Sequence, residues 1–270
     1  MTANLQRQLS ATYGFMERNW ALIRRYLGWE VVWLVYGTVS TLTIGLIGVD
    51  SQGIVGQERV LYLLIGALLW SYLSVLFQVS GETVAWERWE GTIEYTFMAP
   101  VHRFTYLAGQ GLFGVTYSLI RTALILGITV LWFDLDMSRA NLLGGFVVLG
   151  VASISFMGLG LLAAVLPLLS PERGPQATHI IQGLLLLCSS VYYQVTVLPG
   201  WLQPLAKINP ATFALDAIRA TWIGGAPLAE VWPELGKLLI TGAVLVPLGL
   251  MVFQAGERYA LRTGKLKRNG

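Results

Sequence analysis

Residues 140–169 read ANLLGGFVVLGVASISFMGLGLLAAVLPLL, a run without one Asp, Glu, Lys or Arg. The hydrocarbon core of a bilayer is about 30 Å thick, and a helix of about 20 apolar residues crosses it. This run is longer than that, so it predicts a membrane span that tilts or extends into water. Similar runs lie on both sides of it. The six expected spans cover about residues 29–49, 60–80, 105–133, 140–169, 179–198 and 235–255.

The composition of the whole chain agrees with this pattern. Of its 270 residues, 55% are hydrophobic and 12% are charged, whereas soluble proteins carry roughly 25% charged residues. Glycine is tolerated in membrane helices and tryptophan collects at bilayer interfaces, and the chain has 30 glycines and 10 tryptophans. The sequence therefore predicts an all-α polytopic membrane protein, formed as a single domain over residues 1–270. Arginines interrupt any signal-peptide core in the first thirty residues, so the first span is expected to be retained.

The positive charges are distributed unevenly about these spans. Six spans put both termini on one side, together with the loops 81–104 and 170–178, and this side holds 12 of the 18 Lys and Arg residues. The opposite side holds five, and Arg121 lies inside a span. Because Lys and Arg accumulate in cytoplasmic loops, we expect both termini in the cytoplasm of a plasma or inner membrane protein. The segment 199–234, which its prolines prevent from spanning, then faces outside.

Residues 14–28 predict an amphipathic helix that precedes the first span. Met16, Trp20, Ile23 and Leu27 recur at helical spacing, whereas the charged residues occupy other faces. Such a helix lies at the headgroup level with its apolar stripe in the membrane. The alternative is a plain cytoplasmic start to the first spanning helix.

Catalytic and metal-binding groups are scarce in this sequence. The two histidines, His102 and His179, have no carboxylate or cysteine at metal-ligand spacing. Neither Gly-Lys pair is followed by Ser or Thr, as a phosphate-binding loop would require. We therefore expect no metal site, no bound cofactor and no ATP hydrolysis by this chain itself.

Arg121 is the one clear charge near the middle of an expected span. An arginine there costs about 2.5–3.5 kcal/mol on insertion scales, so it must face protein, a partner subunit or water. One interpretation is a contact with an anionic substrate or with a carboxylate across an interface. The other is a structural hydrogen bond to backbone carbonyls.

The loop between the second and third spans reads ERWEGTIEYTFMAP over residues 87–100. Its apolar residues recur every three or four positions and predict a short helix over 86–98, with glutamates around the stripe. Such an acidic, aromatic helix on the cytoplasmic face is typical of a docking element for a protein partner. The alternative is a helix within the headgroups, which three glutamates would oppose near anionic lipid.

At this loop the chain resembles the permease subunits of ABC-2 type ABC exporters. That family's pattern runs E-R-x-x-G-T-x-E, five residues, then Pro-Val, with a Gly near the start of the third span. The matching residues are Glu87, Arg88, Gly91, Thr92, Glu94, Pro100, Val101 and Gly109. The departures are Trp89 and Glu90 after the arginine, and Gln110 where many members have lysine.

A second resemblance lies in LPGWLQPLAKINPATFALDAIRA, residues 198–220. The residues that match the family here are Leu198, Pro199, Trp201, Leu202, Asn209, Pro210, Thr212 and Arg219; Tyr192, Tyr193 and Gln194 replace the usual Gly and Phe-Pro before the segment. Independently of the family, Asn209 followed by Pro210 predicts a helix N-terminus. We expect this helix to run to about Trp222, with Asp216 and Arg219 paired, and to form with the preceding residues a re-entrant hairpin over 199–223. The alternative is an extracellular cap without gating.

The resemblance implies roles for three sets of residues. The ATPase-docking coupling helix would use Glu87, Arg88, Trp89, Gly91, Thr92, Ile93, Glu94 and Phe97. The outer gate would use Pro199, Trp201, Asn209, Pro210, Phe213 and Arg219. The candidate substrate path, lined mainly by the second and fifth spans, would use Tyr72, Phe77, Arg121, Tyr192 and Tyr193.

The resemblance also implies the function and the partners. They are a cytosolic ABC ATPase subunit that binds ATP and Mg²⁺, a second permease subunit (an identical copy or a paralogue) and membrane lipid, with no nucleic acid. The expected cargo is a lipophilic small molecule or a lipid-linked compound. A polysaccharide or glycolipid exporter stays open. An ion-coupled secondary transporter would show internal symmetry and a midplane carboxylate, and a membrane enzyme or assembly factor would show a reactive constellation; we find neither in the sequence.

Overall fold

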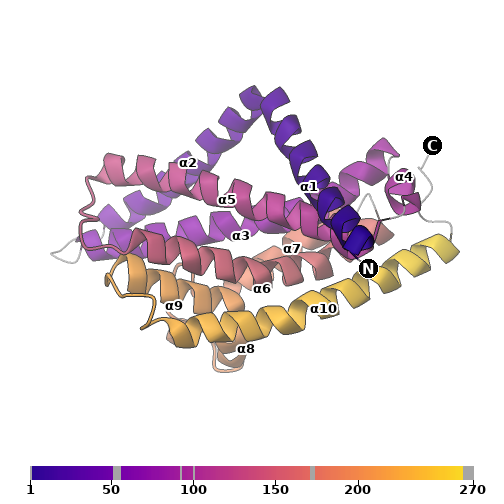
Figure 1. Ribbon diagram of the computed structural model, residues 1–270. Coiled ribbons are helices and arrows are strands. Elements are labelled where there is room, and N and C mark those ends of the chain that lie inside the picture. Colours follow the sequence, from indigo (N-terminus) through magenta and orange to yellow (C-terminus); the bar gives the residue numbers. More distant parts are fainter. Residues whose placement is uncertain (1, 51–55, 92, 100, 171–173, 264–270) are drawn as a thin grey trace.

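The computed structural model describes residues 2–50, 56–91, 93–99, 101–170 and 174–263, and within these ranges its regular elements are all helices (Figure 1). In chain order they are α1 (Thr2–Arg25), α2 (Leu27–Asp50), α3 (Gly56–Glu90), α4 (Ile93–Met98), α5 (Arg103–Phe133), α6 (Leu142–Leu169), α7 (Gly174–Leu187), a 3-10 turn (Val195–Val197), α8 (Gln203–Ile208), α9 (Pro210–Trp222) and α10 (Trp232–Arg262).

Five of the helices in the described residues are long and apolar enough to cross a membrane. They include the stretches Leu27–Val49, Glu58–Val79, Arg103–Phe133, Leu142–Leu169 and Trp232–Arg262. The span expected over 179–198 is different, because α7 has 14 residues and is therefore about 21 Å long, less than the bilayer core. Its helix ends at Leu187, and Ser190 takes a left-handed conformation with φ 49°. The prediction of a full-length helix at this place was wrong.

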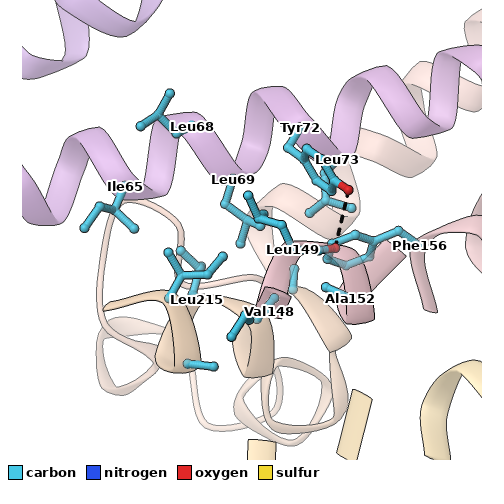
Figure 2. Close-up of a cluster of buried hydrophobic side chains, with 14 of the residues drawn as sticks. Ile65, Leu68, Leu69, Tyr72, Leu73, Val148, Leu149, Ala152, Phe156 and Leu215 are labelled. Carbon is cyan, nitrogen blue, oxygen red and sulfur yellow. Dashed lines mark hydrogen bonds between the residues drawn. The ribbon is translucent and has the colours of Figure 1, made fainter. Parts of the chain in front are cut away.

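Helix α3 lies at the centre of the bundle. In its spanning stretch 72% of the residues are buried, against 28% in that of α2 and 22% in that of α10. Its apolar side chains pack against α6 and α9, as Figure 2 shows. The labelled residues of that cluster are Ile65, Leu68, Leu69, Tyr72, Leu73, Val148, Leu149, Ala152, Phe156 and Leu215. A movement of α3 would therefore disturb most of the core.

Helices α6 and α10 pack with almost no space between them. Gly242, Gly249 and Gly256 recur every seven residues on α10, and a Cβ at Gly249 would lie 2.8 Å from the Cβ of Leu161 and 2.9 Å from the carbonyl oxygen of Gly158. The hydroxyl of Ser155 on α6 also donates a hydrogen bond to the backbone carbonyl of Leu238 on α10. The glycines thus bring the two backbones together along most of their length.

The N-terminal helix is longer than the sequence predicted. It begins at Thr2 rather than near residue 14 and ends at Arg25, after which Tyr26 interrupts the helix before α2 begins. The two helices meet in an elbow, with α1 crossing the first part of α5 (Figure 1). A Cβ at Gly109 would lie 2.8 Å from atoms of Phe15 and of Thr12 in α1. The close approach of the two helices at this crossing therefore depends on a residue without a side chain.

The segment expected as one coupling helix over 86–98 is divided in two. Helix α3 continues through Glu90, and α4 begins at Ile93. Between them Gly91 has φ 75°, a left-handed conformation that is common after a helix C-terminus and that glycine adopts without steric cost. The second spanning helix and the first part of the coupling segment are thus one continuous helix, and α4 lies at the same end of the molecule as the first residues of α1 (Figure 1).

Candidate functional site

Side chains of three helices meet at the end of α3 near α4. The carboxylate of Glu87 is buried and accepts a 3.0 Å hydrogen bond from Nη2 of Arg18 on α1. Next to it, the amide of Asn19 donates a 2.7 Å hydrogen bond to Oε1 of Gln110 on α5. Gln110, which stands where many family members have lysine, therefore binds α1. These contacts join the C-terminal end of α3 to α1, and α1 in turn to α5.

A second ion pair lies at the same end of the molecule. The guanidinium of Arg103, the first residue of α5, contacts the buried carboxylate of Glu257 on α10 at 2.8 Å. The sequence analysis predicted neither ion pair, because the partners are 69 and 154 residues apart. The two pairs join α1 to α3 and α5 to α10 at this end of the molecule.

The predicted docking residues are only partly described. The structure shows Glu87 and Gly91; Thr92 lies outside the described residues, and the side chains of Arg88, Trp89, Ile93, Glu94 and Phe97 lie outside the described side chains. On α4, Tyr95 and Met98 are 74% and 71% exposed. The sequence analysis did not single out these two residues, although their i, i+3 spacing places them on one side of a helix. They form an exposed apolar surface next to the predicted docking residues.

Arg121 makes a contact within the bundle. Its Nη2 donates a 2.8 Å hydrogen bond to the backbone carbonyl of Trp33 on α2, opposite Gly37. One turn away, Tyr117 donates a 2.6 Å hydrogen bond to the carboxylate of Glu30. This geometry matches the second interpretation of Arg121, that of a structural donor to a backbone carbonyl. The sequence analysis missed the contact between Tyr117 and Glu30, because these two residues belong to different spans.

Asn209 organises the start of α9. Its Oδ1 accepts a 3.0 Å hydrogen bond from the backbone N–H of Ala211, which confirms the predicted N-cap before Pro210, and α9 ends at Trp222 as expected. Its Nδ2 donates to the carbonyls of Leu185 and Cys188 at 3.2 and 3.1 Å. Those carbonyls belong to the end of α7 and the turn after it, where no further helical N–H can reach them. One side chain thus caps two helices and holds α9 against α7.

The other predicted gate residues occupy different environments. Pro199 and Trp201 are exposed, and Trp201 is exposed by 74%. The ring of Phe213 is half-buried, 5.4 Å from Nζ of Lys237. Arg219 does not form the expected ion pair with Asp216, which is exposed; its guanidinium instead lies on the ring of Tyr62.

The residues predicted for the substrate path are separated in the structure. Tyr72 is fully buried and hydrogen-bonded to Ser153 and Phe77 is 1% exposed, while Tyr192 and Tyr193 lie half-buried after α7. Phe77 alone of these residues lines the apolar pocket between α3, α6, α7 and α9. The pocket is formed by Trp70, Leu73, Phe77, Phe156, Leu159, Gln182, Leu185, Asn209 and Ala211. Substrate contact by the five predicted residues stays a prediction.

The fold and these contacts define a multi-pass helical membrane protein whose central helix extends past its span to a small exposed helix. A model of the ABC-2 type transporter family matches residues 2–223. The chain therefore belongs to the ABC-2 type transporter family.

Individual relatives are more distant. The chain is 25% identical over 162 residues to the probable doxorubicin resistance ABC transporter permease protein DrrC of Mycobacterium tuberculosis, covering 59% of this chain and 56% of the relative. It is 24% identical over 165 residues to the probable multidrug ABC transporter permease YbhR of Escherichia coli (61% and 44%). It is 28% identical over 139 residues to the daunorubicin resistance ABC transporter permease protein DrrB1 of Streptomyces coeruleorubidus (50% and 47%). The matches span about half the length of these curated relatives.

Proposed function

We propose that this chain is the membrane-spanning subunit of an ATP-driven exporter and that a separate cytosolic ATPase, which binds ATP and Mg²⁺, supplies the energy. The family match over residues 2–223 is the observation that carries the proposal. It is supported by the way α3 continues from the core of the bundle to α4, because a helix of 35 residues is about 52 Å long and exceeds the bilayer core by about 20 Å. A push on the end of α3 that adjoins α4 would thus reach the core along one continuous helix.

The proposal includes a topology with both termini and α4 in the cytoplasm. In this topology α7 enters the membrane from the cytoplasmic side and ends inside it, and α8 and α9 complete this fifth crossing and form the outer gate. Non-helical backbone inside the membrane is tolerated only where it is buried in protein or lines a water-filled cavity. The contacts of Asn209 with the carbonyls of Leu185 and Cys188 meet that requirement.

We assign the substrate to the class of lipophilic small molecules. Two of the relatives are named for resistance to doxorubicin and to daunorubicin, and a third is named as a multidrug permease. In this chain the pocket between α3 and α7 is lined mainly by apolar side chains, with the amides of Gln182 and Asn209 at its margin. A second permease subunit, identical or paralogous, would complete the path.

The proposal predicts that Tyr95→Ala weakens ATPase docking. Buried tyrosines at the centre of protein interfaces commonly contribute more than 1 kcal/mol, so we expect about tenfold less ATPase to co-purify with the variant. Tyr13→Ala on α1 is the matched control, since Tyr13 is 64% exposed and Tyr95 is 74% exposed. Co-purification is measured from solubilised membranes, together with ATP-dependent doxorubicin uptake into inverted vesicles. Equal ATPase recovery with both variants contradicts this docking surface, and the absence of any co-purifying ATPase with the unmodified chain contradicts the proposed function.

A further inference from the structure

The guanidinium of Arg219 connects three segments of the chain. It lies 3.5 Å from the centre of the Tyr62 ring on α3. Its Nη2 donates a 2.9 Å hydrogen bond to the carbonyl of Val191 and longer ones, 3.4 Å each, to those of Ser190 and Tyr62. Arg219 itself belongs to α9. One side chain therefore joins α9 to α3 and to the residues that follow α7.

Two of the carbonyls that Arg219 binds, those of Ser190 and Val191, lie outside any helix. After Leu187 the chain leaves the helix, and Ser190 has φ 49°, yet Ser190 and Val191 are 4% and 0% exposed. Buried carbonyls need a donor, and a planar guanidinium can serve several at once. Gly66 on α3 makes room for the Val191 carbonyl, because a Cβ at this position would overlap it. The end of α7 is therefore seated on α3 and fixed there by Arg219.

The same helix α3 carries the Glu87 ion pair at its other end. Tyr62 and Glu87 are 25 residues apart within one unbroken helix, a distance of about 38 Å. Arg219 thus contacts one end of α3, and the coupling segment begins at the other. A shift of α3 along its axis or a rotation about it would displace the Tyr62 ring beneath Arg219.

We infer that Arg219 is a positioning residue that ties the outer helix α9 to α3, so that movement at the coupling segment releases or closes the outer helices. This inference rests on the proposed function. The guanidinium lies over the face of the Tyr62 ring, and a phenylalanine at this position would keep that face. Arg219 donates to the carbonyls of both Ser190 and Val191. A displacement of α9 would therefore also displace these two residues.

The single cysteine of the chain serves as a reporter of this contact. Cys188 lies in the turn after α7, is half-buried, and packs against Leu198, Leu202 and Ala206. Its carbonyl accepts a hydrogen bond from Asn209 at the start of α9. If α9 separates from α3, this thiol becomes accessible. Its rate of reaction with a maleimide therefore measures release of the outer helices.

The test compares Tyr62→Leu with Tyr62→Phe in the solubilised complex with its ATPase. Without ATP, we expect Tyr62→Leu and Arg219→Lys to react about tenfold faster at Cys188 than the unmodified chain, because the cation–π contact is lost or weakened. Tyr62→Phe keeps the ring and should react at the unmodified rate. ATP should accelerate labelling of the unmodified chain but have little further effect on Tyr62→Leu.

The control places a thiol elsewhere in the core. Ala152→Cys, made in a Cys188→Ser background, lies on α6 at a fully buried position and should react equally slowly with or without Tyr62→Leu. Equal labelling of Tyr62→Leu and Tyr62→Phe overturns the inference, as does a matching acceleration at position 152, which would mean general loosening. Failure of the proposed function looks different: ATP would leave labelling of the unmodified chain unchanged and no doxorubicin export would occur, while the difference between the two Tyr62 variants persists.

Discussion

Replacing Glu87 by arginine is expected to abolish export and to destabilise the end of α3 that carries the coupling segment. The Glu87 side chain is 5% exposed and 3.0 Å from Arg18, whose side chain is 44% exposed. Breaking a buried ion pair costs about 3–5 kcal/mol, and the exposure of Arg18 lowers this to about 2–3 kcal/mol because water screens the pair. The variant also adds a like charge beside Arg18. Stimulated ATPase activity and doxorubicin export by the reconstituted complex measure the effect.

The charge-reversed pair Arg18→Glu with Glu87→Arg separates two reasons for such a loss. If the ion pair matters for the position of α3, the double variant should recover most of the export that Glu87→Arg loses. Recovery of thermal stability without export would show instead that the carboxylate of Glu87 itself contacts the ATPase. Normal export by the single variant Glu87→Arg would contradict both roles.

Gly249→Leu is expected to prevent the chain from folding stably. A Cβ there would already lie 2.8 Å from the Cβ of Leu161 and 2.9 Å from the carbonyl oxygen of Gly158, and a leucine adds three more carbons. Overfilling a packed core costs about 1–3 kcal/mol, and we expect about 3 kcal/mol or more because the contact includes backbone, which cannot rotate away. The yield of monodisperse protein after solubilisation, measured against temperature, reports the loss.

Gly236→Leu provides the matched control on the same helix. A Cβ at Gly236 meets no atom within 4 Å, and leucine is favoured over glycine in a helix by roughly 0.8 kcal/mol. This variant should therefore be as stable as the unmodified chain or slightly more stable, and Gly249→Ala should fall between the two leucine variants. Similar yields for Gly249→Leu and Gly236→Leu would mean that α6 and α10 do not pack as described.

Local patterns in the sequence predicted the features that depend on neighbouring residues. Five of the six expected apolar runs correspond to long helices. They could be predicted because the length and the apolar composition of a segment decide whether its helix can cross a bilayer. Asn209 and Pro210 predicted the start of α9 for a similar reason: the Asn209 side chain and the backbone N–H of Ala211 that donates to it are two residues apart. The resemblance at two motifs predicted the family of the chain, and the family match over residues 2–223 confirmed it.

Features that depend on distant residues were not predictable in this way. The apolar sequence over 179–198 favours a full helix, yet α7 ends early; the end is stabilised by Asn209 and Arg219, which lie about 20 to 30 residues further on. Arg219 was expected to bind Asp216, three residues away, and instead lies on Tyr62, 157 residues away in sequence. In both cases burial against α3 outweighs the local preference.

The elbow at Tyr26 has a consequence for how the protein sits in its bilayer. Helix α1 is anchored to α3 and α5 through Arg18 and Asn19, whereas α2 joins it through a single non-helical residue and exposes most of its surface. A change in the tilt of α2 that keeps its hydrogen bonds to Arg121 and Tyr117 would therefore adapt the first crossing to thinner or thicker membranes. The ion pair between Arg18 and Glu87 would stay undisturbed while the first crossing adapts to its lipid.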